Sequence, residues 1–141
     1  MLHSEVRTFD DNVEDQIERR IGEIVESIAR AAGGSAQVRF YDRVPVSISD
    51  PALVKRMLPA LERAVGPSNV TLTPAVMAAD DLAYFAQEAP AFFFMLGTQK
   101  PGTASGINHA PSFLADDSSI LVGMRAMTQV VLEYLQTTAA P

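Results

Sequence analysis

The spacing of apolar residues predicts one long amphipathic helix near the start of the chain. Its apolar positions recur every three or four residues, and charged side chains such as Glu14 and Arg20 fill the other side. Asp10-Asp11 precede this pattern, where acidic residues cap a helix and complement its dipole. Gly33-Gly34 follow it as helix-ending residues. The apolar stripe consists of Val13, Ile17, Ile21, Ile24, Val25 and Ile28.

Two short segments on either side of this helix predict strands. Residues 5–9 alternate Val6 and Thr8 with the neighbouring side chains, and residues 36–42 (AQVRFYD) show the same period of two. Such alternation is typical of a strand with one face toward water. Because the two segments are joined through one helix, a parallel, right-handed pairing is expected if they share a sheet.

The next part of the chain predicts a second helix. Asp50-Pro51 form a helix start, with a capping carboxylate followed by proline at the first helical position. An apolar stripe continues to Val65, and Gly66-Pro67 end it. Pro59 lies inside this stripe and is expected to kink or split the helix, because it removes a backbone donor. Residues 69–72 then predict a short strand.

The remaining pattern alternates helix, strand and helix. Residues 77–88 predict a helix with Leu82 and Phe85 directed inward, and residues 118–135 predict a long closing helix with Ser118-Ser119 as its cap. Residues 91–96 read as an apolar strand covered on both faces, with Phe92 and Phe94 on one side and Phe93 on the other.

This order of elements predicts an α/β fold that is incomplete. A strand as apolar as residues 91–96 normally lies in the middle of a larger parallel sheet, and so few other strands cannot cover both of its edges. The chain is therefore expected to be a slice of something larger.

Composition narrows the class of protein. The 141 residues are 48% apolar and 20% charged, which places the chain among folded proteins. A net charge of -6 argues against nucleic acid as a partner. No apolar run approaches the roughly 20 residues of a membrane span, so no membrane partner is expected. The chain has no cysteine and shows no secretory signal pattern, which fits a cytoplasmic location.

A loop rich in glycine, proline and serine carries the most interesting candidate. It spans residues 97–113, and His109 lies just ahead of Ala110-Pro111. Neutral imidazole is the commonest side-chain metal ligand, and α/β proteins place sites in loops that leave the C-terminal ends of buried strands. From spacing alone an ordinary surface histidine is the commoner explanation. A metal needs three or four ligands, and no second ligand lies nearby at ligand spacing.

Asp80 and Asp81 are the second candidates. Adjacent carboxylates at a helix start could orient a ligand or act as a base, but more often they cap the helix, and capping is the preferred interpretation on sequence alone. Asp116-Asp117 have the same capping explanation. Neither a GxSxG nucleophile motif nor a glycine-rich phosphate loop is present.

Several stretches, taken in order, resemble the C-terminal part of one family. It is the metal-dependent amidohydrolase group of aminoacylases and hippurate hydrolases, a peptidase family that includes auxin-conjugate hydrolases. The resembling stretches cover nearly the entire chain: SEVRTFDDNVEDQIERRI, SDPALVKRM, MAADDLAYFAQEAPAFFFMLGT, NHAPSF and VGMRAMTQVVLEYL.

The resemblance implies a two-domain enzyme with a binuclear metal site. Residues 1–46 would be the closing strand-helix-strand of a ferredoxin-like, dimerisation-type lid domain, and residues 47–141 the C-terminal α/β portion of the catalytic domain. His109 matches the histidine of the family's HxPxF-like loop, which supplies the final metal ligand. The divalent metal would be zinc or manganese, and the substrate a small-molecule N-acyl amino acid whose amide bond is hydrolysed.

The same resemblance places the other metal ligands and the general-base Glu upstream of this chain. We therefore expect no catalytic residue here, no tightly bound metal and no activity of the isolated chain. Where the family usually reads GSEDF, this chain has Ala78-Ala79-Asp80-Asp81-Leu82. Asp80 is one methylene shorter than the expected Glu, whereas Asp81 matches the family's Asp and stays a substrate or supporting candidate.

A second hypothesis is not enzymatic. The chain could be a non-catalytic interaction or oligomerisation module derived from that fold. Unpaired strand edges and uncovered apolar faces favour association with a partner or self-association as a homo-oligomer.

Overall fold

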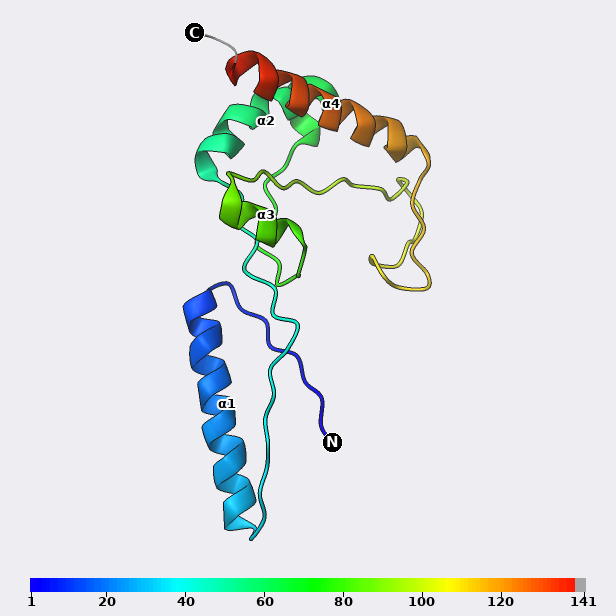
Figure 1. The fold of residues 1–141 in the computed structure, drawn as a ribbon. Helices are drawn as coiled ribbons and strands as arrows, with labels where there is room; N and C mark the ends of the chain where they lie inside the picture. Colours follow the sequence, from blue (N-terminus) through cyan, green and yellow to red (C-terminus); the bar gives the residue numbers. More distant parts are fainter. Residues whose placement is uncertain (139–141) are drawn as a thin grey trace. The chain divides into compact units, whose positions relative to one another are not determined.

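The computed structural model describes residues 1–138, and the regular structure of these residues is helical (Figure 1). Contacts divide the chain into two compact units. The first unit comprises residues 1–48 and 74–91, and the second comprises residues 49–73 and those from Phe92 onward. The predicted domain boundary near residue 46 stays a prediction, because contacts within one chain do not test it. The helical elements are α1 (Asp11–Ala31), α2 (Pro51–Val65), the 3-10 turn η1 (Pro67–Asn69), α3 (Leu82–Glu88) and α4 (Ser118–Thr138).

Helix α1 confirms the predicted long amphipathic helix. The Asp10 carboxylate accepts hydrogen bonds from the backbone N–H of Asn12 at 2.7 Å and of Val13 at 3.2 Å, so it satisfies two donors of the first turn. These hydrogen bonds lower the pKa of Asp10 below its ordinary value, because they favour the ionised form. At the other end, Gly33 has φ +76°, a left-handed conformation that costs glycine little and ends the helix.

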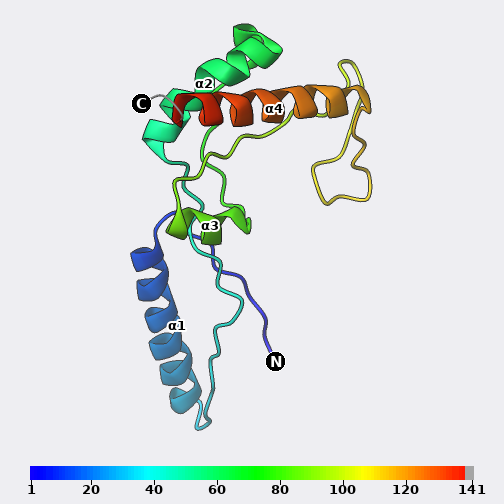
Figure 2. The ribbon, with the colours of Figure 1, turned by 45° about the horizontal axis from the view of Figure 1, so that its top comes forward.

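The predicted strands do not form among residues 1–138. Residues 5–9 and 36–42 run as extended segments without ladder hydrogen bonds, and the latter returns along α1 (Figures 1 and 2). The predicted strand over residues 69–72 begins inside the 3-10 turn η1. In the predicted strand over residues 91–96, the Phe93 N–H donates to the side-chain Oγ of Ser49 at 2.9 Å and not to a neighbouring strand. The strand-helix-strand and α/β expectation is therefore corrected to a helical description. Alternation is a local property, whereas a strand exists only when a neighbour pairs with its backbone.

Helix α2 is the centre of the second unit. The Asp50 carboxylate caps it by accepting from the Leu53 N–H at 2.7 Å, and Pro51 occupies the first turn, as predicted. The helix continues through Pro59 to Val65, so the expected split does not occur. Pro59 is exposed, and a helix can tolerate one missing backbone bond on its solvent side.

Helices α2 and α4 pack against one another to form the core of the second unit. Leu61 and Ala64 of α2 meet Ala126 of α4. Polar contacts add to the packing: the Arg56 guanidinium lies 4.7 Å from the Tyr134 ring centroid and also donates to the Tyr134 carbonyl at 2.8 Å. The half-buried side chains around the cluster are Val65, Val70, Phe92, Phe94 and Val130.

The predicted alternation of the phenylalanine run is confirmed even though no strand forms. Phe92 and Phe94 pack against the core of the second unit, with their ring centroids 5.8 Å apart, whereas Phe93 is exposed. An extended backbone sends successive side chains to opposite sides with or without a pairing partner.

The helix predicted over residues 77–88 is shorter than expected. α3 begins only at Leu82, because the Asp80 carboxylate accepts from the Leu82 N–H at 2.9 Å and the Asp80 carbonyl from the Ala83 N–H at 3.0 Å. The prediction that Phe85 points inward is wrong, since its side chain is 71% exposed, and Ala83 is the buried residue of this helix. No helix among residues 1–138 is long and apolar enough to cross a membrane.

Candidate functional site

The loop that carries His109 is a folded structure closed at its base. The Asp116 N–H donates to the Thr98 carbonyl at 2.8 Å, which joins the two ends of the loop. Farther out, the Gly106 N–H donates to the Ser112 carbonyl at 2.9 Å, and the Leu114 N–H donates to Ser105 Oγ at 2.9 Å. The loop therefore has a defined tip, which residues 107–111 form.

Gly106 fits this loop because it has no side chain. A Cβ at this position would meet the Ser112 side chain and would approach the Phe113 nitrogen to 3.1 Å. The close approach of residues 106 and 112–113 brings the chain back on itself and leaves His109 at the turn between them.

His109 lies at the tip of the loop in an uncommon backbone conformation. Its φ is +69°, in the left-handed region, which costs a residue with a Cβ roughly 1–2 kcal/mol. The His109 N–H donates to Asn108 Oδ1 at 3.1 Å, and the Ala110 N–H donates to the Ile107 carbonyl at 3.0 Å. The residue is exposed to solvent. His109 thus lies on an exposed turn.

Asp80 and Asp81 belong to the first unit, whereas His109 belongs to the second. The Asp80 carboxylate holds the start of α3 through its hydrogen bond to the Leu82 N–H. Asp81 occupies the N-cap position but makes no side-chain capping bond, and its carboxylate is exposed. A structural role thus accounts for Asp80, while the substrate role of both residues stays a prediction.

The described residues do not complete a metal site. No group of three or more His, Asp or Glu side chains within residues 1–138 is arranged to hold a metal ion. The loop offers the right donor chemistry in a single imidazole, but three or four ligands are needed. A divalent metal therefore does not fit this chain alone, and no step is derived through one.

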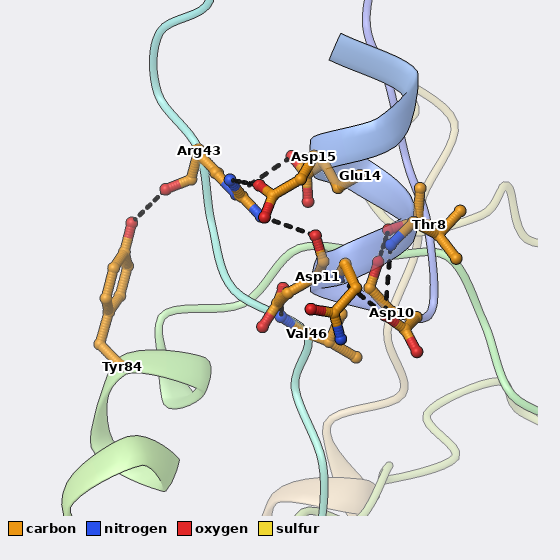
Figure 3. A network of polar contacts seen from close by, with 10 residues as sticks. Thr8, Asp10, Asp11, Glu14, Asp15, Arg43, Val46 and Tyr84 are labelled. Atoms are coloured by element: carbon orange, nitrogen blue, oxygen red, sulfur yellow. Dashed lines mark hydrogen bonds and ion pairs between the residues drawn. The ribbon is translucent and has the colours of Figure 1, made fainter. Parts of the chain in front are cut away.

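A polar network in the first unit escaped the sequence analysis (Figure 3). Arg43 donates to Asp15 Oδ1 at 2.5 Å and to the Asp11 carbonyl at 3.0 Å, and its Nε lies 3.6 Å from Glu14 Oε1. The hydrogen bond to Asp15 raises the pKa of Arg43 above its ordinary value. The Arg43 carbonyl accepts from Tyr84 Oη at 2.8 Å.

This Arg43 network fastens the returning segment to both α1 and α3. The Val46 N–H also donates to Asp11 Oδ1, at 3.3 Å. Asp42, just ahead of Arg43, has φ +56°, which turns the chain at this point. Residue spacing does not predict the Arg43 network, because the partners lie about 30 and 40 residues apart along the chain.

Comparison with known proteins gives the family. The model of "Peptidase family M20/M25/M40" matches residues 4–133. "Uncharacterized hydrolase y4tI" of Sinorhizobium fredii is 27% identical over 95% of this chain and 32% of its own length. "Thermostable carboxypeptidase 2" of Saccharolobus solfataricus is 27% identical over 94% of this chain and 34% of its own. "IAA-amino acid hydrolase ILR1-like 6" of Arabidopsis thaliana is 26% identical over 96% of this chain and 30% of its own.

The chain spans about a third of the length of each of these relatives. No solved structure shows a significant match. The family model, in contrast, extends over nearly the whole chain and includes both α1 and the loop of His109. The chain belongs to peptidase family M20/M25/M40.

Proposed function

We propose that this chain forms the C-terminal part of a divalent-metal-dependent amidohydrolase that cleaves the amide bond of N-acyl amino acids. In that enzyme His109 supplies one metal ligand, and the remaining ligands and the general base come from polypeptide outside this chain. Asp81, with Asp80, lies near the substrate or supports the site. The metal is zinc or manganese.

The family match over residues 4–133 is the observation that carries this proposal. Enzymes of this family are generally dependent on divalent metal ions. The names of the relatives supply the substrate class, because they include an IAA-amino acid hydrolase, an N-acetyl-L-cysteine deacetylase and a carboxypeptidase. Two of these names specify an amino acid that carries an acyl group, which supports N-acyl amino acids as the substrate class.

The geometry of the loop supports His109 as the ligand. His109 is an exposed residue on a loop closed at its base, so its imidazole is accessible to a metal held by other residues. The left-handed backbone at His109 is costly for a residue with a side chain, and such conformations cluster at functional sites. A metal in the complete site would polarise the amide carbonyl and activate water.

Isolated residues 1–141 are inactive under this proposal. The described residues bring no three metal-binding side chains together, which supports the expectation that the remaining ligands come from other polypeptide. Purified chain is expected to release no amino acid from N-acetyl amino acids or hippurate with zinc or manganese present. Hydrolysis by the chain alone would contradict this part of the proposal.

A loop graft tests the role of His109. Residues 98–116 form a segment whose ends are joined by the hydrogen bond from Asp116 to Thr98, so they can replace the matching loop of Thermostable carboxypeptidase 2. The grafted enzyme is expected to keep its metal-dependent hydrolysis. His109→Ala in the graft is expected to lower kcat/KM at least about 100-fold, because loss of a metal ligand costs no less than loss of a supporting residue.

Asn108→Ala in the same graft is the matched control. Asn108 is the neighbouring exposed residue, and only its contact with the His109 N–H is lost. We expect a change of less than about tenfold, because Asn108 contacts the His109 backbone and not its ring, and so is not a supporting partner of the ligand. Equal activity of the His109→Ala graft and the unchanged graft would overturn the assignment of His109.

The alternative function is a non-catalytic interaction or oligomerisation module. It is favoured by the apolar residues that α4 exposes, among them Leu121, Met124 and Leu135. Light scattering of the purified chain separates the two proposals. A stable oligomer that binds no metal supports the module, and a monomer contradicts it.

A further inference from the structure

We propose that Tyr84 and Arg43 are positioning residues that fix the place of the Asp81 carboxylate. This inference rests on the proposed function, in which Asp81 lies near the substrate or supports the site. The Tyr84 hydroxyl donates to the Arg43 carbonyl at 2.8 Å (Figure 3). The Tyr84 N–H donates to the Asp81 carbonyl at 3.1 Å, so Tyr84 and Asp81 belong to the same turn of the chain.

Helix α3 depends on contacts outside itself. It has seven residues, and isolated helices shorter than about 12–15 residues are marginal in water. Asp81 makes no side-chain capping bond, and the buried residue of the helix is Ala83, whose side chain is only a methyl group. No other helix in the described part of the chain packs against α3. The Tyr84 hydroxyl therefore supplies a tertiary contact that this short helix needs.

The Arg43 carbonyl is a fixed acceptor, because the Arg43 side chain is anchored to α1. The guanidinium donates to Asp15 Oδ1 at 2.5 Å and to the Asp11 carbonyl at 3.0 Å, and the Val46 N–H donates to Asp11 Oδ1 at 3.3 Å. The pair of Arg43 and Asp15 is exposed, and such ion pairs contribute little stability, so the network acts chiefly on geometry. Arg43 thus connects α1, through its side chain, to α3, through its carbonyl.

The turn ahead of α3 is held at both ends. Arg7 donates to the Met77 carbonyl at 2.7 Å before the turn, and Arg43 accepts from Tyr84 after it. Between these two anchors lies Asp81, whose carboxylate is exposed and caps no helix. Loss of the Tyr84 hydroxyl would therefore release the end of the turn that carries Asp81.

Amide hydrogen exchange of the 141-residue chain tests the contact itself. Tyr84→Phe removes the hydroxyl and keeps the ring. We expect the amides of residues 83 and 84 to exchange about fivefold faster, as for the loss of one hydrogen bond, while those of α2 and α4 keep their rates. Arg43→Ala keeps the carbonyl but frees it from α1, and it is expected to accelerate the same amides. Tyr41→Phe is the matched control, because it removes a hydroxyl of the same unit that lies beside His3, and it should leave α3 unchanged.

A chimera extends the test to hydrolysis. In it, residues 1–141 replace the matching third of Thermostable carboxypeptidase 2. Tyr84→Phe is expected to raise KM for hippurate about fivefold, with kcat within about twofold and the metal content unchanged, because a displaced carboxylate weakens substrate binding. In the Asp81→Ala background, Tyr84→Phe is expected to change KM less than about twofold, because Tyr84 acts through Asp81. A purely structural role would instead give the same change in both backgrounds.

Several results would overturn the proposal. They are unchanged exchange of residues 83 and 84 in Tyr84→Phe, equal acceleration by Tyr41→Phe, an unchanged KM in the chimera, and a full effect of Tyr84→Phe in the Asp81→Ala background. Failure of the proposed function looks different, because the chimera would then keep its activity and its metal after His109→Ala. If the chimera does not fold, unchanged exchange in the 141-residue chain is by itself enough to overturn the role of Tyr84.

Discussion

Truncation of Leu61 to alanine tests how the second unit is held together. Leu61 is only 7% exposed and packs with Ala64 of α2 and Ala126 of α4. Leu61→Ala removes three carbons from this cluster, which corresponds to about 2 kcal/mol of lost burial. Cavity formation raises the cost of such a change to as much as about 5 kcal/mol where the surroundings cannot close.

The surroundings of Leu61 can close in part, because Phe92, Phe94 and Val130 around it are only partly buried. We therefore expect Leu61→Ala to lower the free energy of unfolding by about 2–3 kcal/mol, toward the lower end of the range. In a small domain this shifts the melting temperature by about 10–20 °C. Urea and thermal unfolding, followed by circular dichroism at 222 nm, measure both quantities.

Leu58→Ala is the matched control, because it is the same substitution in the same helix at a residue that is 37% exposed. Its expected cost is below about 1 kcal/mol, as for most surface positions. If the two variants unfold at the same urea concentration, α2 does not pack through Leu61, and the described core of the second unit is wrong.

Three further predictions concern local structure. Asp10→Asn replaces the ionisable cap of α1 with an uncharged one. Hydrogen bonds lower the pKa of Asp10 in the folded chain below the unfolded pKa of 3.8. The Asp10 carboxylate therefore stabilises α1 above pH 3.8, and this stabilisation is lost as the pH falls through the folded pKa. The helical signal of the unchanged chain should therefore fall further between pH 5 and 2 than that of the variant, and identical profiles would contradict the cap. Gly106→Ala forces Ser112 and the adjacent backbone to move, so cleavage of the loop by protease should accelerate. Gly97→Ala is the control, because a Cβ there meets open space and should leave the cleavage rate unchanged. Equal cleavage rates of the two variants would refute the close approach at Gly106. Pro59→Ala restores a helix-interior backbone donor and should stabilise the second unit by about 1–3 kcal/mol in urea unfolding, and an unchanged midpoint would show that the helix does not continue through this position.

The helices could be predicted because their signals are local. Asp10 and Asp50 cap the helices that follow them, at the positions expected from the sequence. Each cap reaches only two or three residues along the chain, so the sequence contains both the donor and the acceptor. The alternation of Phe92 and Phe94 with Phe93 has the same local origin.

The strands and the Arg43 network depend on residues that are distant in sequence. Alternation in residues 5–9 and 36–42 predicts which side chains share a face, but it cannot provide a neighbouring strand. Arg43 contacts Asp15 and Tyr84 directly after the chain turns at Asp42, which has φ +56°. Aspartate adopts this left-handed conformation more readily than most residues, but residue spacing does not predict where it occurs. Residue spacing likewise does not predict the left-handed backbone at His109.

The metal content of the grafted carboxypeptidase tests the role of His109 most directly. With residues 98–116 in place, the purified enzyme is expected to hold as much divalent metal as the unaltered carboxypeptidase, and His109→Ala in the graft is expected to lose about one equivalent per chain. Full zinc occupancy without the imidazole, or tight stoichiometric zinc binding by the isolated 141-residue chain, would contradict a ligand that completes a site built by other polypeptide.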